Sequence, residues 1–124
     1  MSPIKWLLAI ALLACGSLAV SSRVHAAQAT DACKQGYVWR EAFHGDHVCV
    51  KPDVRDQAVV DNRDGPTRRQ PGGGPYGQDT CRSGYVWREA NPRDHVCVKP
   101  EIRDQAATDN RDAHNRVARK QYTF

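Results

Sequence analysis

The sequence predicts a small, disulfide-stapled α+β protein with two tandem modules, each a β-hairpin followed by a short α-helix. Two repeated phrases lead to this fold class. GYVWREA occurs at Gly36–Ala42 and again at Gly84–Ala90, and DHVCV occurs at Asp46–Val50 and again at Asp94–Val98. Each DHVCV contains a cysteine and follows another cysteine upstream, as expected for a repeated unit that carries its own covalent closure.

The repeated phrases belong to one long duplication. Residues 31–64 align with residues 79–112 without a gap, with 24 of 34 positions identical at a constant offset of 48. A match of this length indicates a tandem duplication. The chain therefore divides into a signal peptide (1–26), module 1 (31–64), a Gly/Pro-rich linker (65–78), module 2 (79–112) and a basic tail (113–124).

Each module is expected to contain two strands and one helix. Tyr37–Arg40 and His47–Val50 are rich in β-formers, and the residues between them are typical of a loop. Pro52 suits the first position of a helix, and an acid directly after it suits the helix N-terminus. Val54 and Ala58 then fall four residues apart, on one helical face.

The segments outside the modules have a different character. The linker has three prolines and five glycines in 14 residues, which predicts a mobile or semi-extended connection. The tail has a polar helical pattern through Val117 and Ala118, and we expect it to extend the second helix.

The N-terminal residues predict export. MSPIK supplies one positive charge, WLLAIALLA is a short apolar run, and small residues lead to a cleavage site after Ala26 or Ala27. The run is shorter than the roughly 20 apolar residues of a membrane-spanning helix, so we expect no transmembrane span in the mature chain. We expect a periplasmic or secreted protein. Leu12–Cys15 resembles a lipobox and leaves a lipid anchor through Cys15 as a minor alternative.

The charge distribution argues against a nucleic-acid partner. The net charge of +4 falls to +2 when the signal peptide, with Lys5 and Arg23, is removed. Acids balance bases within the modules, so the excess of positive charge lies in the linker and tail, at Arg68, Arg69, Arg116, Arg119 and Lys120. Phosphate binding needs clustered Lys and Arg, which the modules lack.

Four cysteines remain in the mature chain: Cys33, Cys49, Cys81 and Cys97. Four cysteines can pair into disulfides in three ways. Duplication favours pairing within each copy. A unit of this size generally needs a staple, and closing such a loop is worth about 3 kcal/mol. In an exported protein we therefore predict the disulfides Cys33–Cys49 and Cys81–Cys97.

Chemical activity is the competing interpretation. His47 and Cys49 lie on one side of a strand, and with Cys33 they form a set of soft zinc ligands. Glu41 with His47 could instead perform acid–base chemistry. The export signal, the missing Cys-x-x-Cys spacing and the lack of a nucleophile argue against both, so we predict no metal, no cofactor and no enzyme. In the non-enzymatic interpretation, Asp46 caps the turn and His47 makes a structural hydrogen bond.

Tryptophan and arginine are the other candidates for function. Trp39 and Trp87 could form the core of each module, or could be exposed platforms for sugar rings or a partner's apolar residue. Arg40 and Arg88 are expected to form surface ion pairs with the glutamates that follow them.

A second pair of arginines stands at an unfavourable position. Arg55 and Arg103 lie near the helix start, where the helix dipole disfavours a cation. This predicts a specific partner, such as Glu41 or Asp46, or a binding role.

The repeated pattern resembles a short repeat of secreted bacterial proteins. It covers about residues 33–57 and 81–105, from the first cysteine of each copy through GYVWREA and DHVCV to a proline, an arginine and a glutamine. The resemblance implies export and modularity, and no activity, ligand or catalytic residue.

Together these observations predict an exported bacterial protein that acts as a non-enzymatic binding module at the cell envelope. The expected partner is an envelope glycan or protein, held by a monomer whose two weak sites gain avidity on one chain. The candidate contact residues are Trp39, Arg40, His47, Trp87, Arg88 and His95. The alternatives are a small metal-dependent or acid–base hydrolase that uses the Glu/His/Cys set, and a structural or inhibitory protein.

Overall fold

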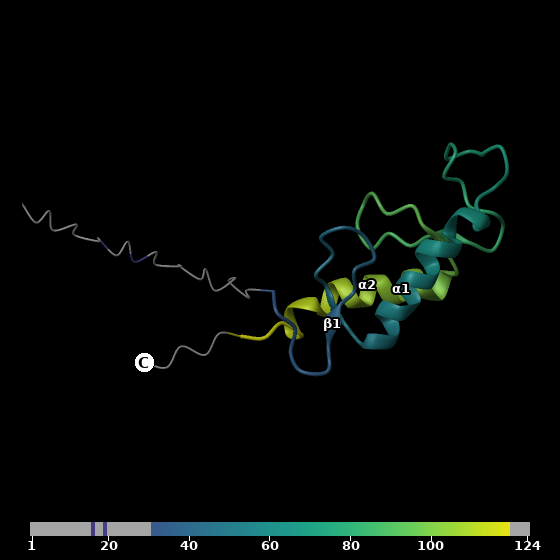
Figure 1. Cartoon of the computed structure of the whole chain (residues 1–124). Coiled ribbons are helices and arrows are strands. Elements are labelled where there is room, and N and C mark those ends of the chain that lie inside the picture. The colour runs from purple at the N-terminus through teal and green to yellow at the C-terminus, as the bar shows by residue number, and fades with distance from the viewer. Residues whose placement is uncertain (1–15, 17–18, 20–30, 120–124) are drawn as a thin grey trace, which may run out of the picture.

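The computed structural model describes Gly16, Ala19 and residues 31–119, which include both modules, the linker and most of the tail (Figure 1). The predicted signal peptide otherwise lies outside the described residues, as does the lipobox cysteine Cys15.

Both modules are hairpins followed by helices, and the predicted fold class is confirmed. Module 1 consists of β1 (Val38–Trp39), β2 (Cys49–Val50) and α1 (Pro52–Asp64), and the 3₁₀ turn η1 (Gly65–Arg68) begins the linker. Module 2 consists of β3 (Val86–Trp87), β4 (Cys97–Val98) and α2 (Pro100–Asp112), and the 3₁₀ turn η2 (Ala113–Asn115) begins the tail.

The strands are shorter than the sequence suggests. In module 1 only Val38 and Trp39 pair with β2, in an antiparallel register that places Val38 opposite Val50. The ladder stops because Glu41 turns into the left-handed region, with a φ of 53°. The chain then makes a loop before it returns at Val48, whose carbonyl accepts from Arg40 N at 2.8 Å.

Both predicted disulfides are confirmed. Cys33 is bonded to Cys49 and Cys81 to Cys97, with Cα–Cα distances of 5.5 and 5.6 Å. The second cysteine of each pair lies in a fully buried strand directly before the helix. Each disulfide therefore ties the start of its module to the base of its helix.

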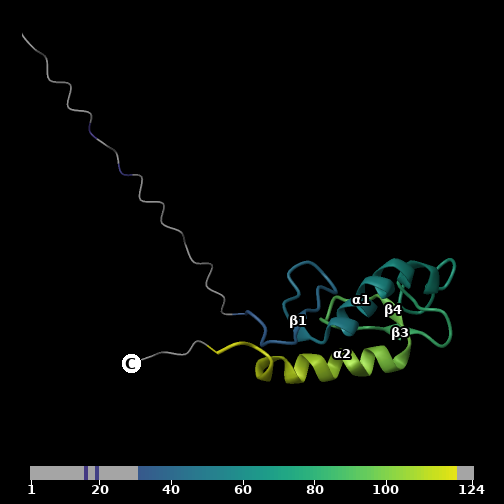
Figure 2. The ribbon, with the colours of Figure 1, turned by 60° about the horizontal axis from the view of Figure 1, so that its bottom comes forward.

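The two modules share one core. The buried cluster contains one loop alanine and one helix alanine from each module: Ala42, Ala58, Ala90 and Ala106. Figures 1 and 2 show α1 and α2 next to each other and running in roughly opposite directions. Because alanine side chains are small, the two modules approach closely, and each supplies apolar surface that the other lacks.

The linker is folded, although its composition predicts a mobile or semi-extended segment. After η1, Arg69 forms a β-bridge with Cys81, and Gln70 N donates to Thr80 O at 2.8 Å. The Thr80 hydroxyl donates to Gly77 O at 2.8 Å and so closes the glycine-rich turn. At Gly73, whose φ is 82°, a Cβ would lie 3.0 Å from Gly77 O, so this tight turn requires glycine.

The tail repeats this arrangement on module 1. It extends α2 only as η2, and then Val117 forms a β-bridge with Cys33. Lys34 N donates to Arg116 O at 2.8 Å, and Ala118 N donates to Ala32 O at 2.7 Å. We call residues 65–70 the linker strap and residues 113–118 the tail strap. Each strap follows the helix of one module and pairs with the first cysteine of the other module.

One arginine fixes each strap. Arg116 Nη1 donates to Asp109 Oδ1 at 2.7 Å and to Cys49 O of module 1 at 3.2 Å. Arg68 Nη1 makes the equivalent bonds to Asp61 Oδ1 at 3.0 Å and to Cys97 O at 3.3 Å. The hydrogen bond to Asp109 raises the pKa of Arg116 above its ordinary value. Part of the excess positive charge of the linker and tail is therefore structural.

We expect Arg116→Ala to lower the free energy of unfolding by about 3 kcal/mol, because it leaves the buried Asp109 carboxylate without its cation. Arg68→Ala should cost a similar amount although it lies in the linker. Chemical denaturation with intact disulfides measures both. The control is Arg111→Ala, whose side chain is 70% exposed and should change stability by less than about 0.5 kcal/mol. Equal stability of the Arg116 and Arg111 variants would contradict the assigned role of the tail strap.

Candidate functional site

Each module has an open hollow beside its tryptophan. The Trp87 hollow has a volume of about 350 Å³, and its lining includes Tyr76, Tyr85, Trp87, Glu89 and Arg103. The Trp39 hollow has a volume of about 270 Å³, and its lining includes Tyr37, Trp39 and Arg55. A tyrosine, a tryptophan and an arginine therefore recur at equivalent positions in both hollows.

A histidine covers one face of each indole. Trp39 stacks on His47, with ring centroids 3.7 Å apart and planes 14° apart, and Trp39 Nε1 donates to Asp31 O at 2.9 Å. His47 Nδ1 also contacts the Asp31 carboxylate. The Trp39 side chain is half-buried. It therefore combines the two roles expected for the tryptophans, since one face packs against His47 and the residue also lines the hollow.

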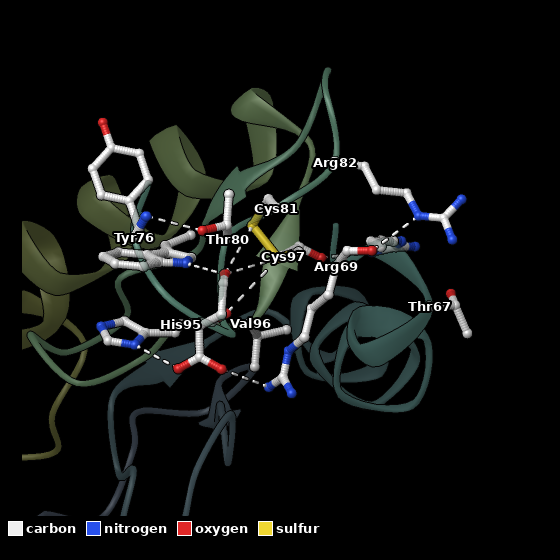
Figure 3. Close-up of a disulfide and its surroundings, with 12 residues drawn as sticks. Thr67, Arg69, Tyr76, Thr80, Cys81, Arg82, His95, Val96 and Cys97 are labelled. Carbon is white, nitrogen blue, oxygen red and sulfur yellow. Dashed lines mark hydrogen bonds and ion pairs between the residues drawn. A yellow bond between two sulfur atoms is a disulfide. The ribbon is translucent and has the colours of Figure 1, made fainter. Parts of the chain in front are cut away.

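Module 2 repeats this arrangement and adds to it. Trp87 stacks on His95 at 3.8 Å, and its Nε1 donates to Asp79 O at 2.7 Å. The Asp79 carboxylate pairs with His95 at 3.1 Å and with Arg69 of the linker strap at 3.4 Å. His95 and Arg69, both labelled in Figure 3 near the Cys81–Cys97 disulfide, thus share one carboxylate partner.

The linker contributes a further aromatic wall to module 2. Tyr76 and Trp87 form a T-shaped aromatic pair with ring centroids 5.6 Å apart, and 72% of Tyr76 is exposed. Its backbone is fixed because Tyr76 N donates to the Thr80 hydroxyl at 3.0 Å (Figure 3). The Trp87 hollow is therefore the larger and more aromatic of the two.

An ion pair lies at the helix start beside each hollow. Arg55 pairs with Glu41, and Arg103 with Glu89. Of the two partners expected for Arg55, the structure thus selects Glu41. Both glutamates have a left-handed backbone, with φ values of 53° and 54°. A non-glycine residue in this region is strained, and here the strained residue directs a carboxylate to the arginine.

Arg40 and Arg88 do not lie in the hollows, and the expected surface pair with the following glutamate is wrong. Arg40 is 2% exposed and forms a bidentate pair with Asp46, at 2.7 Å from Nε to Oδ2 and 3.1 Å from Nη2 to Oδ1. Asp46 also accepts from Ala42 N at 3.0 Å, as expected for a residue that caps the turn. Buried charges need such partners, so the loop closes around this pair.

The buried arginines also reach across to the other module. Arg88 pairs with Asp94 at 2.7 Å, and its Nη2 donates to Ala42 O at 3.2 Å. Arg40 Nη2 lies 3.5 Å from Ala90 O. The structure therefore brings each tryptophan to its histidine and places the adjacent arginine at the junction of the modules.

The groups of the hydrolase alternative are engaged elsewhere. His47 contacts Asp31 rather than Glu41, and both cysteines of the proposed zinc set are in a disulfide. Within the described part of the chain, no three His, Cys, Asp or Glu side chains are grouped so as to hold a metal ion. The metal hypothesis thus lacks its thiolate ligands.

Two sets of lining residues were missed by sequence reasoning. Tyr37 and Tyr85 stand two residues before each tryptophan in the repeated GYVW, and this shared position was an available signal. Tyr76 had no such signal, because it belongs to the linker and reaches the hollow only through the fold of that segment.

Comparisons of the chain with protein-family models, with curated proteins and with solved structures found no match. Among the described residues, no helix has the length and apolar character needed to cross a membrane. The assignment of the hollows therefore rests on their own geometry.

The strained glutamates allow a direct test of backbone cost. We expect Glu89→Gly to be more stable than Glu89→Ala by about 1 kcal/mol, since both lose the pair with Arg103 and only glycine relieves the positive φ. Thermal or chemical unfolding of the two variants measures the difference. Equal stabilities would show that the left-handed backbone at Glu89 is not strained.

Proposed function

We propose that the protein is an exported bacterial binding protein, without enzymatic activity, that attaches to a glycan of the cell envelope through its two tryptophan hollows. The observation that carries this proposal is the recurrence of the Tyr–Trp–Arg lining in both modules. The disulfides support a location in an oxidising compartment, periplasmic or secreted, which agrees with the signal peptide expected from the sequence.

The chemistry of the hollows suits a sugar. Small-ligand sites are concave and mostly apolar or aromatic, with a few polar groups that fix orientation. The Trp87 hollow provides aromatic faces from Tyr76 and Trp87, and the Arg103–Glu89 pair provides a donor and an acceptor for hydroxyl groups. Each arginine is roughly half-exposed beside its hollow, so these arginines replace Arg40 and Arg88 in the contact set.

Duplication favours a polymeric ligand. Two weak sites on one molecule gain apparent affinity when a ligand engages both, provided that the geometry permits it. The shared alanine core and the two straps fix the hollows relative to each other. A glycan with repeated units can meet both hollows of one monomer, whereas a single sugar meets only one.

The test uses the mature protein and the insoluble glycan and membrane fractions of the host envelope. We expect co-sedimentation with the glycan fraction and a change in tryptophan fluorescence. Tyr76→Ala should weaken retention about 3- to 10-fold, since an aromatic contact contributes about 0.5–1.5 kcal/mol. Its side chain is mostly exposed, so the fold should persist.

Val59→Ala is the matched control, because Val59 is 61% exposed on α1 and does not line either hollow. It should bind like the unchanged protein. The proposal fails if no envelope fraction retains the protein, or if Tyr76→Ala and Arg103→Ala both bind as well as Val59→Ala.

A further inference from the structure

A second concave site lies between α1 and α2, away from the tryptophans. This interhelical groove has a volume of about 420 Å³. Its apolar lining comes from both helices: Val54 and Ala58 of α1, and Ile102 and Ala106 of α2. The duplication thus creates here a site that neither module has alone.

Four of the residues that line the groove have a buried polar atom without a partner. These atoms are Nη1 of Arg40, Nη1 of Arg88, Oδ2 of Asp61 and Oδ2 of Asp109. The four residues are only 1–2% exposed. A buried polar group without a hydrogen bond costs about 1–3 kcal/mol, so such groups normally have a partner.

The four atoms define the complementary ligand. Two guanidinium N–H groups require acceptors, and two carboxylate oxygens require donors. A peptide backbone supplies both, through its C=O and N–H groups, and the apolar walls suit the methylenes of a long side chain. A simple amine or inorganic anion satisfies only one of the two kinds.

The charge of the groove favours a basic ligand. Its four buried charges are already compensated, the arginines by Asp46 and Asp94 and the aspartates by the strap arginines. Asp53 and Glu101 remain, one in the first turn of each helix, and within residues 31–119 neither forms an ion pair. The lining therefore has two uncompensated negative charges, which attract a cation.

We propose that the interhelical groove binds a short, extended, lysine-containing segment of a protein partner. The peptide backbone hydrogen-bonds the four unpartnered atoms, the lysine methylenes lie between Val54 and Ile102, and the ammonium group pairs with Asp53 or Glu101. This site is separate from the tryptophan hollows, so the protein would bind a second partner beside its envelope glycan.

The test is an NMR titration of the mature chain with acetyl-Ala-Lys-Ala-amide, acetyl-Ala-Glu-Ala-amide and spermidine. We expect the lysine peptide to bind at least 10-fold more tightly than the glutamate peptide, with shifts confined to α1, α2 and the buried arginines. Binding should weaken as salt is raised. Spermidine, which provides no acceptor for the arginines, should bind more weakly than the lysine peptide.

Two variants locate the site. Val54→Arg with Ile102→Arg fills the groove with side chains that carry the same positive charge as the lysine peptide. This variant should reduce lysine-peptide affinity at least 10-fold. Asp53→Asn with Glu101→Gln alters only exposed side chains, and should reduce it about 3-fold or more. Val59→Arg adds one positive charge on α1 outside the groove lining and should bind like the unchanged protein.

Three outcomes would overturn the proposal: no lysine-peptide shifts up to about 10 mM, equal binding of the glutamate peptide or spermidine, or unchanged affinity in the Asp53→Asn, Glu101→Gln variant. None of them bears on glycan retention, which Tyr76→Ala tests separately.

Discussion

The buried Arg40–Asp46 pair and its copy, Arg88–Asp94, determine where most other groups lie. In module 1 the carboxylate holds the guanidinium and Ala42 N, so the loop after β1 closes tightly. This closure places Ala42 in the shared core and turns Glu41 outward through a left-handed backbone. Glu41 then holds Arg55 beside the Trp39 hollow.

A module of about 34 residues is too small to bury a sufficient core alone. The disulfide restrains its unfolded chain, worth about 3 kcal/mol in the entropic model. The rest comes from the other module, through four alanines and two exchanged straps. Because each strap pairs with the first cysteine of the module that it does not follow, each module completes the other. Stability and the interhelical groove therefore belong to the pair of modules.

The sequence was most informative where local chemistry decides the structure. Pro52 begins α1 as expected, and the cysteine pairing followed from duplication and size. The placement of Arg40 could not be read from the local pattern, since an arginine beside a strand is ordinarily solvated, whereas here it pairs inside the module with an aspartate six residues later in the loop. The predicted strands were too long for a related reason. The chain leaves the strand at Glu41, whose positive φ is not expected for a glutamate.

The linker and tail show how composition can mislead. Glycine and proline indicate local freedom, but the Thr80 hydroxyl and the bridge to Cys81 hold the linker in one conformation. One sequence signal was available. Arg68 and Arg116 obey the same 48-residue offset as the modules, just beyond the aligned block. Their shared spacing marks the straps.

Single-tryptophan reporters can show whether the two modules fold as one unit. In a chain prepared without residues 1–26, which contain Trp6, Trp87→Phe leaves Trp39 to report on module 1, and Trp39→Phe leaves Trp87 to report on module 2. Asp46→Asn in module 1 is added to each reporter, and denaturant unfolding is followed by fluorescence with the disulfides intact. If the modules fold as one unit, the Trp87 transition shifts by about 3 kcal/mol, as far as the Trp39 transition does. An unshifted Trp87 transition would show that the two modules unfold independently.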